Sequence, residues 1–160
     1  MDMVTIVGIG DRGDGAEPSW SQYGNAPDGT RQAGSSRITA ATVGGLRPLW
    51  RFSAGGPVTG TPAIADGMVY IGSYDGTLYA LDAQTGQSRW EYATRADAFE
   101  RDMRVPLGIS GSAAISGDNV IVGDANAVLH AVDPERGNVV WRTSVEAAPN
   151  GSIWSSPVVW

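Results

Sequence analysis

The sequence contains no cysteine and only one histidine among its 160 residues. The absence of cysteine excludes disulfide bonds and thiolate metal ligands, and one histidine does not favour a zinc centre or a histidine-activated nucleophile. Basic residues are also scarce, with 11 Lys and Arg against 17 Asp and Glu and a net charge of −6. This charge argues against nucleic acid or an anionic membrane as a partner. No apolar run approaches the ~20 residues of a membrane helix, and residues 1–10 lack the basic start of a signal peptide.

What the sequence does contain is a repeat. Residues 60–92 recur without a gap as residues 111–143, at a constant offset of 51 residues from Gly60 to Gly111. The identical pairs include Gly60/Gly111, Ile64/Ile115, Gly72/Gly123, Asp82/Asp133, Gly86/Gly137 and Trp90/Trp141. A repeat with a fixed period indicates a fold built by stacking copies of one unit. A third copy begins at residues 156–159.

Each unit reads as four short strands joined by tight turns. In the first copy, the expected strands cover residues 61–65, 68–72, 77–82 and 88–92. They are rich in β-branched and aromatic residues, and Asp66-Gly67 and Asp75-Gly76 are typical of hairpin turns. The strand count and the period are those of a propeller blade. We therefore predict an all-β partial propeller with two four-stranded antiparallel blades, an initial strand and the start of a third blade.

The chain divides into six segments. We assign residues 1–19 to a disordered leader, 20–56 to an initial segment with a strand that completes a last blade, 57–92 to blade 1, 93–108 to a long charged loop, 109–145 to blade 2, and 146–160 to the truncated start of blade 3. Two blades cannot close a ring, so we expect this chain to be the N-terminal part of a longer protein. Because open blades leave strand edges unpaired, the isolated chain is expected to self-associate or to remain partly molten.

Trp50, Trp90 and Trp141 recur near the end of each unit, and two of them follow a repeated glycine. We predict that each ring packs against the neighbouring blade, which removes on the order of 150–250 Å² of aromatic surface from water. Trp154 does not belong to this series. His130 aligns with Tyr79, so it is interpreted as a packing residue.

Three other patterns favour structural roles. Residues 8–13 match G-x-G-x-x-G, but residues 14–18 cannot form the helix that a dinucleotide site requires. Asp75, Asp124 and Asn126 lie in equivalent turns, which explains their presence more simply than calcium does. Residues 150–152 fit a glycosylation acceptor but read as a turn.

Residues 80–90 and 131–141 resemble the A-x-D-x-x-T-G-x-x-x-W docking motif of the pyrroloquinoline-quinone (PQQ) type of β-propeller repeat. Residues 20–24, 29–31 and 50–52 resemble the start of quinoprotein dehydrogenases, which are eight-bladed. Residues 48–50 and 153–157 are most similar to the polyvinyl-alcohol dehydrogenase branch. The resemblance implies that the full-length parent has eight blades and is periplasmic or extracellular.

The resemblance also locates a cofactor site. PQQ in the alcohol dehydrogenases lies over the propeller axis, near the first strands of successive blades. The Glu, Arg and Thr contacts of that branch are replaced here by Thr59, Gly111 and Trp154. Trp154 could stack on a planar cofactor and Arg104 could reach a carboxylate, which makes these two residues the candidate cofactor contacts. We expect the catalytic residues and the calcium ligands beyond Trp160, and no metal ligands within this chain.

Two functions follow from the resemblance. The first is a quinoprotein that uses PQQ and calcium to oxidise alcohols or polymeric alcohols and passes the electrons to an acceptor. The alternative is a cofactor-free scaffold that binds proteins or polysaccharide, as in outer-membrane assembly. Because a site on the axis needs blades from the whole ring, the chain alone is expected to bind no cofactor and to be inactive.

Overall fold

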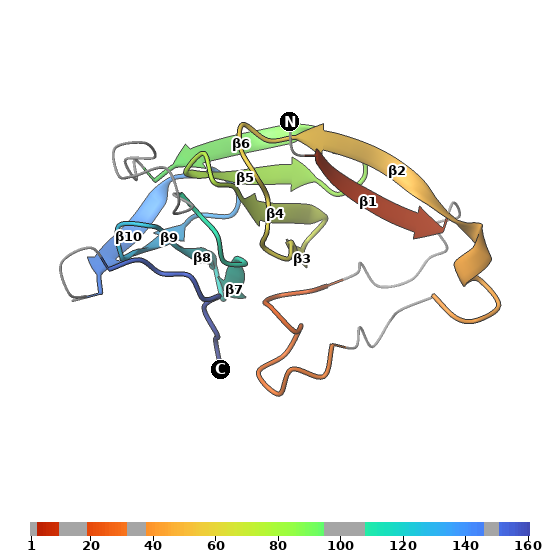
Figure 1. The fold of residues 1–160 in the computed structure, drawn as a ribbon, viewed down its shortest axis with the longest axis horizontal. Coiled ribbons are helices and arrows are strands. Elements are labelled where there is room, and N and C mark those ends of the chain that lie inside the picture. Colours follow the sequence, from red (N-terminus) through yellow and green to blue (C-terminus); the bar gives the residue numbers. More distant parts are fainter. Residues whose placement is uncertain (1–2, 10–18, 32–37, 95–107, 146–150) are drawn as a thin grey trace.

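The computed structural model describes residues 3–9, 19–31, 38–94, 108–145 and 151–160. Within these ranges the regular structure consists of ten β-strands and one short 3-10 turn, η1 (Val43–Gly45). The strands form two four-stranded sheets and one two-stranded ribbon (Figure 1). The predicted all-β class with two antiparallel blades is confirmed. Among the described residues, no helix is long and apolar enough to cross a membrane.

The first blade is an antiparallel sheet whose strands follow the chain order from the inner to the outer edge. Its strands are β3 (Ala63–Ala65), β4 (Met68–Gly72), β5 (Thr77–Asp82) and β6 (Ser88–Ala93). The turn between β3 and β4 has positive φ at both central residues, 49° at Asp66 and 72° at Gly67. This is the backbone of a two-residue hairpin whose twist matches that of the strands it joins.

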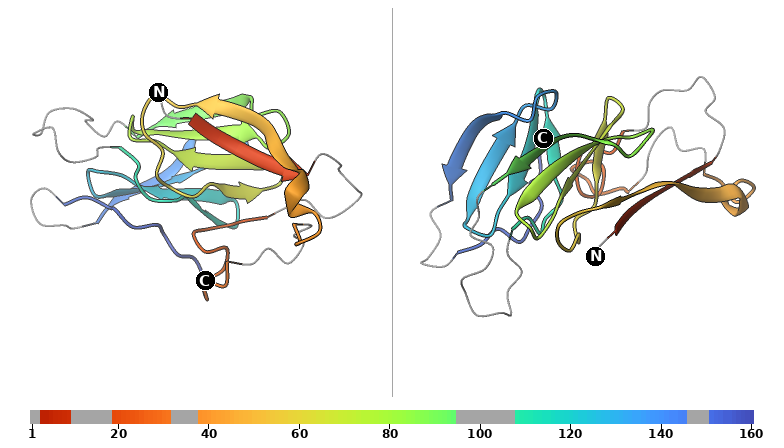
Figure 2. Two further views of the ribbon diagram at one scale, coloured as in Figure 1. Left: turned by 45° about the vertical axis from the view of Figure 1, so that its right-hand side comes forward. Right: turned by 90° about the horizontal axis from the view of Figure 1, so that it is seen from above.

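The second blade repeats the first. Its strands are β7 (Ala114–Ser116), β8 (Asn119–Gly123), β9 (Val128–Val132) and β10 (Val139–Ser144), paired in the same order. Figures 1 and 2 show the two sheets side by side, with the inner strands β3 and β7 close together. The inner strands are therefore the part of each blade that faces the propeller axis.

The core lies between the blades rather than within them. Alternate residues of β4 and β5 contribute to two clusters, one on each face of blade 1. One cluster faces blade 2 and includes Tyr70, Leu78, Ala80, Val120, Val122 and Val132. The other faces β2 (Leu46–Ser53) and includes Trp50, Val69, Ile71, Tyr79 and Leu81. Burial on both faces explains why β4 and β5 are almost continuously apolar.

Residues 3–9 form strand β1 (Met3–Ile9), which pairs antiparallel with β2 from Met3 opposite Ser53 to Ile9 opposite Leu46. The leader assigned to residues 1–19 did not include this strand. Its sequence has consecutive β-branched residues from Val4 to Val7, which favour an extended backbone. The initial strand expected around Trp50 corresponds to β2.

Candidate functional site

Successive repeats meet backbone to backbone at the inner edge. A Cβ atom added at Gly60 would lie 2.7 Å from the carbonyl oxygen of Gly111, and one added at Gly111 would lie 2.6 Å from that of Ser155. Any side chain would therefore separate the repeats at these two positions. The glycine shared by both copies is explained by this close approach.

A hydrogen-bond series fixes the register of three repeats. The backbone N–H of Thr61 donates to the hydroxyl of Ser112 over 2.8 Å. The N–H of Ser112 donates in turn to the hydroxyl of Ser156 over 2.9 Å. Thr61, Ser112 and Ser156 are therefore equivalent, and residues 151–160 lie where the first segment of a third repeat belongs.

The same register brings Thr59, Ser110 and Trp154 to equivalent positions before the inner strands. The Thr59 hydroxyl donates over 3.0 Å to the carbonyl of Ser110 and lies 3.2 Å from the hydroxyl of Tyr74. Trp154 is 52% exposed. The contacts thus place Ser110 at the position equivalent to Thr59. We name Thr59, Ser110 and Trp154 the hub residues.

The hub residues offer hydroxyl groups and one exposed indole but no charge. The other candidate, Arg104, lies outside the described residues. Among the residues that the structure describes, no group of three or more His, Asp or Glu side chains could hold a metal ion. An indole suits stacking on a flat ring, whereas a tricarboxylate quinone also needs cationic partners. The hub residues alone do not fit PQQ, and no catalytic step can be assigned to them.

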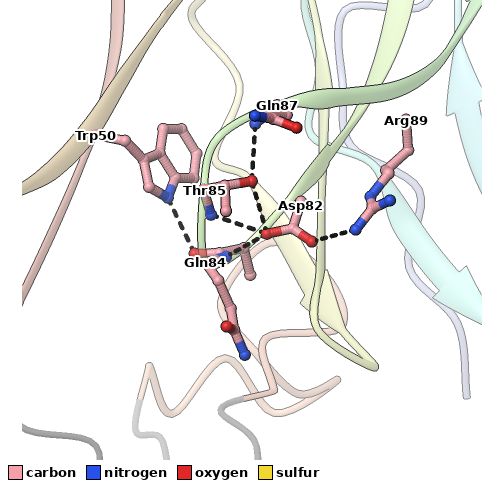
Figure 3. A network of polar contacts seen from close by, with 7 residues as sticks. Trp50, Asp82, Gln84, Thr85, Gln87 and Arg89 are labelled. Carbon is pink, nitrogen blue, oxygen red and sulfur yellow. Dashed lines mark hydrogen bonds and ion pairs between the residues drawn. The ribbon is translucent and has the colours of Figure 1, made fainter.

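The repeated tryptophans join neighbouring units. The Trp50 indole N–H donates over 3.0 Å to the carbonyl of Ala83 (Figure 3). Its ring lies over Gly86, where an added Cβ would be 2.5 Å from the ring. Gly86 has a φ of 71°, so both its space and its backbone conformation favour glycine. Trp50 therefore connects β2 to blade 1.

Trp90 makes the same contact between blade 1 and blade 2. Its indole N–H donates over 2.8 Å to the carbonyl of Pro134, and its ring lies over Gly137. The predicted packing of Trp50 and Trp90 against the neighbouring unit is confirmed. Tyr70 lies beside Trp90, with ring centroids 5.9 Å apart, and burial raises the pKa of Tyr70 to about 12. Trp141, at the equivalent position in blade 2, is 41% exposed.

The turn that receives Trp50 is organised by Asp82. One oxygen of its carboxylate accepts hydrogen bonds from the N–H groups of Gln84 and Thr85 and from the Thr85 hydroxyl, and the other pairs with Arg89 at 2.7 Å (Figure 3). Asp133 accepts the two equivalent N–H bonds in blade 2. The interaction with Arg89, followed by the bonds from Thr85, holds the pKa of Asp82 well below its usual range.

Asp82 gives the protein an acid-dependent stability. Because its pKa is lower in the folded than in the unfolded state, its contribution is present above about pH 4 and is lost as the pH falls towards the folded pKa. We expect the Asp82→Asn variant to lose stability less steeply than the parent below about pH 4. Urea midpoints measured across that range test this, with Asp118→Asn, in an exposed turn, as the control. Parallel curves for the parent and Asp82→Asn would contradict the expectation.

A buried polar chain also crosses the interface between the two blades. The Tyr92 hydroxyl lies 2.9 Å from Nδ1 of His130, and Nε2 of His130 lies 3.0 Å from Oδ2 of Asp124. The other Asp124 oxygen accepts the N–H groups of Asn126 and Val128. His130 and Asp124 are each 1% exposed, so a substrate cannot reach them. The chain of contacts is a structural connection, in agreement with the packing role inferred for His130.

Blade 1 has its carboxylate at a different position of the turn and a different ring at the position equivalent to His130. Tyr79 replaces His130 and donates over 2.6 Å to Asp75, which lies two residues after the position equivalent to Asp124. The Asp75 carboxylate also accepts the N–H of Thr77, the residue equivalent to Val128. The carboxylate thus lies two residues later in the turn of blade 1, where its partner is Tyr79 instead of histidine. This coordinated difference between the two copies was the signal in the sequence that could have revealed the buried chain.

The fold and the interlocking tryptophans define a sector of a β-propeller. The family model described as "Outer membrane protein assembly factor BamB" (PQQ_2) matches residues 19–160. The chain therefore belongs to this family of PQQ-type propeller repeats, as the docking motif predicted.

Known relatives include oxidoreductases. Quinoprotein alcohol dehydrogenase PedH of Pseudomonas putida is 33% identical over 138 residues, which cover 82% of this chain and 22% of that protein. Polyvinylalcohol dehydrogenase of Pseudomonas sp is 26% identical over 142 residues, covering 86% of this chain and 21% of that protein. The crystal structure of quinohemoprotein alcohol dehydrogenase from Comamonas testosteroni matches with a TM-score of 0.63 and 25% identity, over 79% of this chain and 19% of that one. The chain thus spans about a fifth of the length of these relatives.

Proposed function

We propose that this chain forms the first sector of a quinoprotein-type dehydrogenase that oxidises alcohols or polymeric alcohols. The observation that carries the proposal is the similarity to alcohol and polyvinylalcohol dehydrogenases over most of the chain. The exposed indole of Trp154 at the hub supports it, because a flat ring can stack there. In this proposal the cofactor is PQQ with calcium, the charged and catalytic groups come from other blades, and the protein acts in the periplasm or outside the cell.

A second function is favoured by the chemistry of the hub residues. The Thr59 hydroxyl is engaged with Ser110, and the hub residues carry no charge. A cofactor-free propeller that binds a protein or a polysaccharide would need no charge at this position. The family description, an outer-membrane protein assembly factor, supports the same alternative.

Titration of the full-length protein with PQQ in the presence of calcium separates the two functions. The dehydrogenase predicts stoichiometric uptake, seen by absorbance, and PQQ-dependent oxidation of an alcohol. The Trp154→Ala variant should bind PQQ up to about tenfold more weakly through the loss of stacking, whereas Gln87→Ala, in the exposed turn between β5 and β6, should bind normally. Absence of uptake would overturn the dehydrogenase and leave the scaffold.

A further inference from the structure

The segment that begins at Trp20 contacts the inner edges of both blades. Trp20 and Ile64 exchange two backbone hydrogen bonds of 2.8 Å, so Trp20 adds one residue to the edge of β3. The next carbonyl, that of Ser21, accepts the N–H of Ile115 on β7 over 2.7 Å. Ile64 and Ile115 are identical positions of the repeat. The carbonyls of two consecutive residues, Trp20 and Ser21, therefore accept hydrogen bonds from equivalent backbone N–H groups of two successive blades.

The third residue continues the series. The Gln22 side-chain carbonyl, Oε1, accepts the N–H of Val159 over 2.9 Å, and Gln22 is only 3% exposed. Val159 follows Ser156 by three residues, as Ile115 follows Ser112, so the register of the hub makes these amides equivalent. Three consecutive residues thus bond one equivalent amide from each of three successive repeats.

The backbone after Gln22 explains why the third bond comes from a side chain. Gly24 and Asn25 both have positive φ, 77° and 72°, and the N–H of Asn25 donates back to the carbonyl of Gln22. The N–H of Arg31 closes the loop by donating to the carbonyl of Gly24 over 3.0 Å. The main chain therefore turns away at this point, and the longer side chain of Gln22 spans the remaining distance.

We propose that residues 20–22 are a strap that sets the spacing of three successive repeats at the hub. Protection of a strand edge would explain the Trp20 pairing alone. It does not explain why Ser21 and Gln22 each contact a further repeat. The strap matters most for residues 151–160, which contain no strand and are held by a few separate bonds, including those to Asp124, Ser112 and Gln22. Through this segment the strap also helps to fix the position of Trp154.

Amide hydrogen exchange of this chain tests the strap residue by residue. Gln22→Met keeps the length of the side chain but removes the acceptor, so exchange at Val159 should become about tenfold faster. Exchange at Ile64 and at Tyr70 in the core should change little. Gln87→Met, in an exposed turn, is the matched control and should leave Val159 unchanged. If Gln22→Met does not fold, Gln22→Asn keeps the amide one methylene shorter and carries the same expectation.

The pattern of exchange decides the outcome. Acceleration confined to Val159 and its neighbours in residues 151–160 supports the strap. Unchanged exchange at Val159 in a folded variant overturns it. Equal acceleration at Val159, Ile64 and Tyr70 also overturns it, because Gln22 would then contribute only to global stability.

Discussion

The Trp90→Ala variant is expected to lower the free energy of unfolding by about 3 kcal/mol. The ring fills the space over Gly137 between the blades, and its N–H satisfies the carbonyl of Pro134. Truncation would leave a cavity beside Tyr70, and the Pro134 carbonyl would keep only the longer, 3.4 Å hydrogen bond from the Tyr70 hydroxyl. Both effects destabilise the interface. Urea unfolding followed by circular dichroism measures the difference.

When both variants are made in the 160-residue chain, Trp141→Ala is the matched control for this experiment. Trp141 occupies the equivalent position in blade 2, but 41% of its surface is exposed. Its replacement should cost less than about 1 kcal/mol. Equal losses for the two variants would mean that the contact between blades adds nothing to the stability of either tryptophan, which would contradict the docking role.

The Asp124→Ala variant is expected to lower the free energy of unfolding by about 3 kcal/mol or more. Asp124 is buried and holds the N–H groups of Asn126 and Val128 together with Nε2 of His130. Removing the carboxylate leaves all three of these polar groups without their partner inside the protein. The loss is measured by urea unfolding, as for Trp90.

Two variants define what Asp124 contributes. Asp124→Asn keeps one oxygen for the two backbone N–H groups and should be less destabilising than Asp124→Ala. Asn126→Ala changes an exposed side chain in the same turn and should stay within about 0.5 kcal/mol of the parent. If Asp124→Ala proves as mild as Asn126→Ala, the chain from Tyr92 to Asp124 does not hold the two blades together.

The blades and the docking of Trp50 and Trp90 were predictable because the residues that determine them recur in both copies of the repeat. Each strand is a short run of β-branched and aromatic residues between turn residues, and each tryptophan recurs beside a repeated glycine. Such signals are local or periodic, so two copies suffice to recognise them. The cofactor contact assigned to Trp154 stays a prediction.

The strap and the buried polar chain could not be derived in the same way. Gln22 meets Val159 across 137 residues of sequence, and Tyr92 meets His130 across 38. No period relates these partners, because each contact depends on how complete blades pack. A glutamine before a glycine-rich loop and a histidine within a strand have many other common roles. The coordinated change from Asp75 and Tyr79 to Asp124 and His130 marks one end of the buried chain in the sequence. Only the three-dimensional arrangement shows that Tyr92 completes it and that Gln22 meets Val159.

The hydrogen bonds at the hub show that successive repeats keep the same contact when the segments that connect them differ in length. The bond from Thr61 to Ser112 spans 51 residues of sequence, whereas the equivalent bond from Ser112 to Ser156 spans 44. The same contact is thus reached through connections of different length. Insertions and deletions between blades can consequently accumulate without changing how neighbouring blades contact each other at the hub. These connections are therefore the places where a tag, a reporter peptide or a grafted binding loop should be accepted most readily.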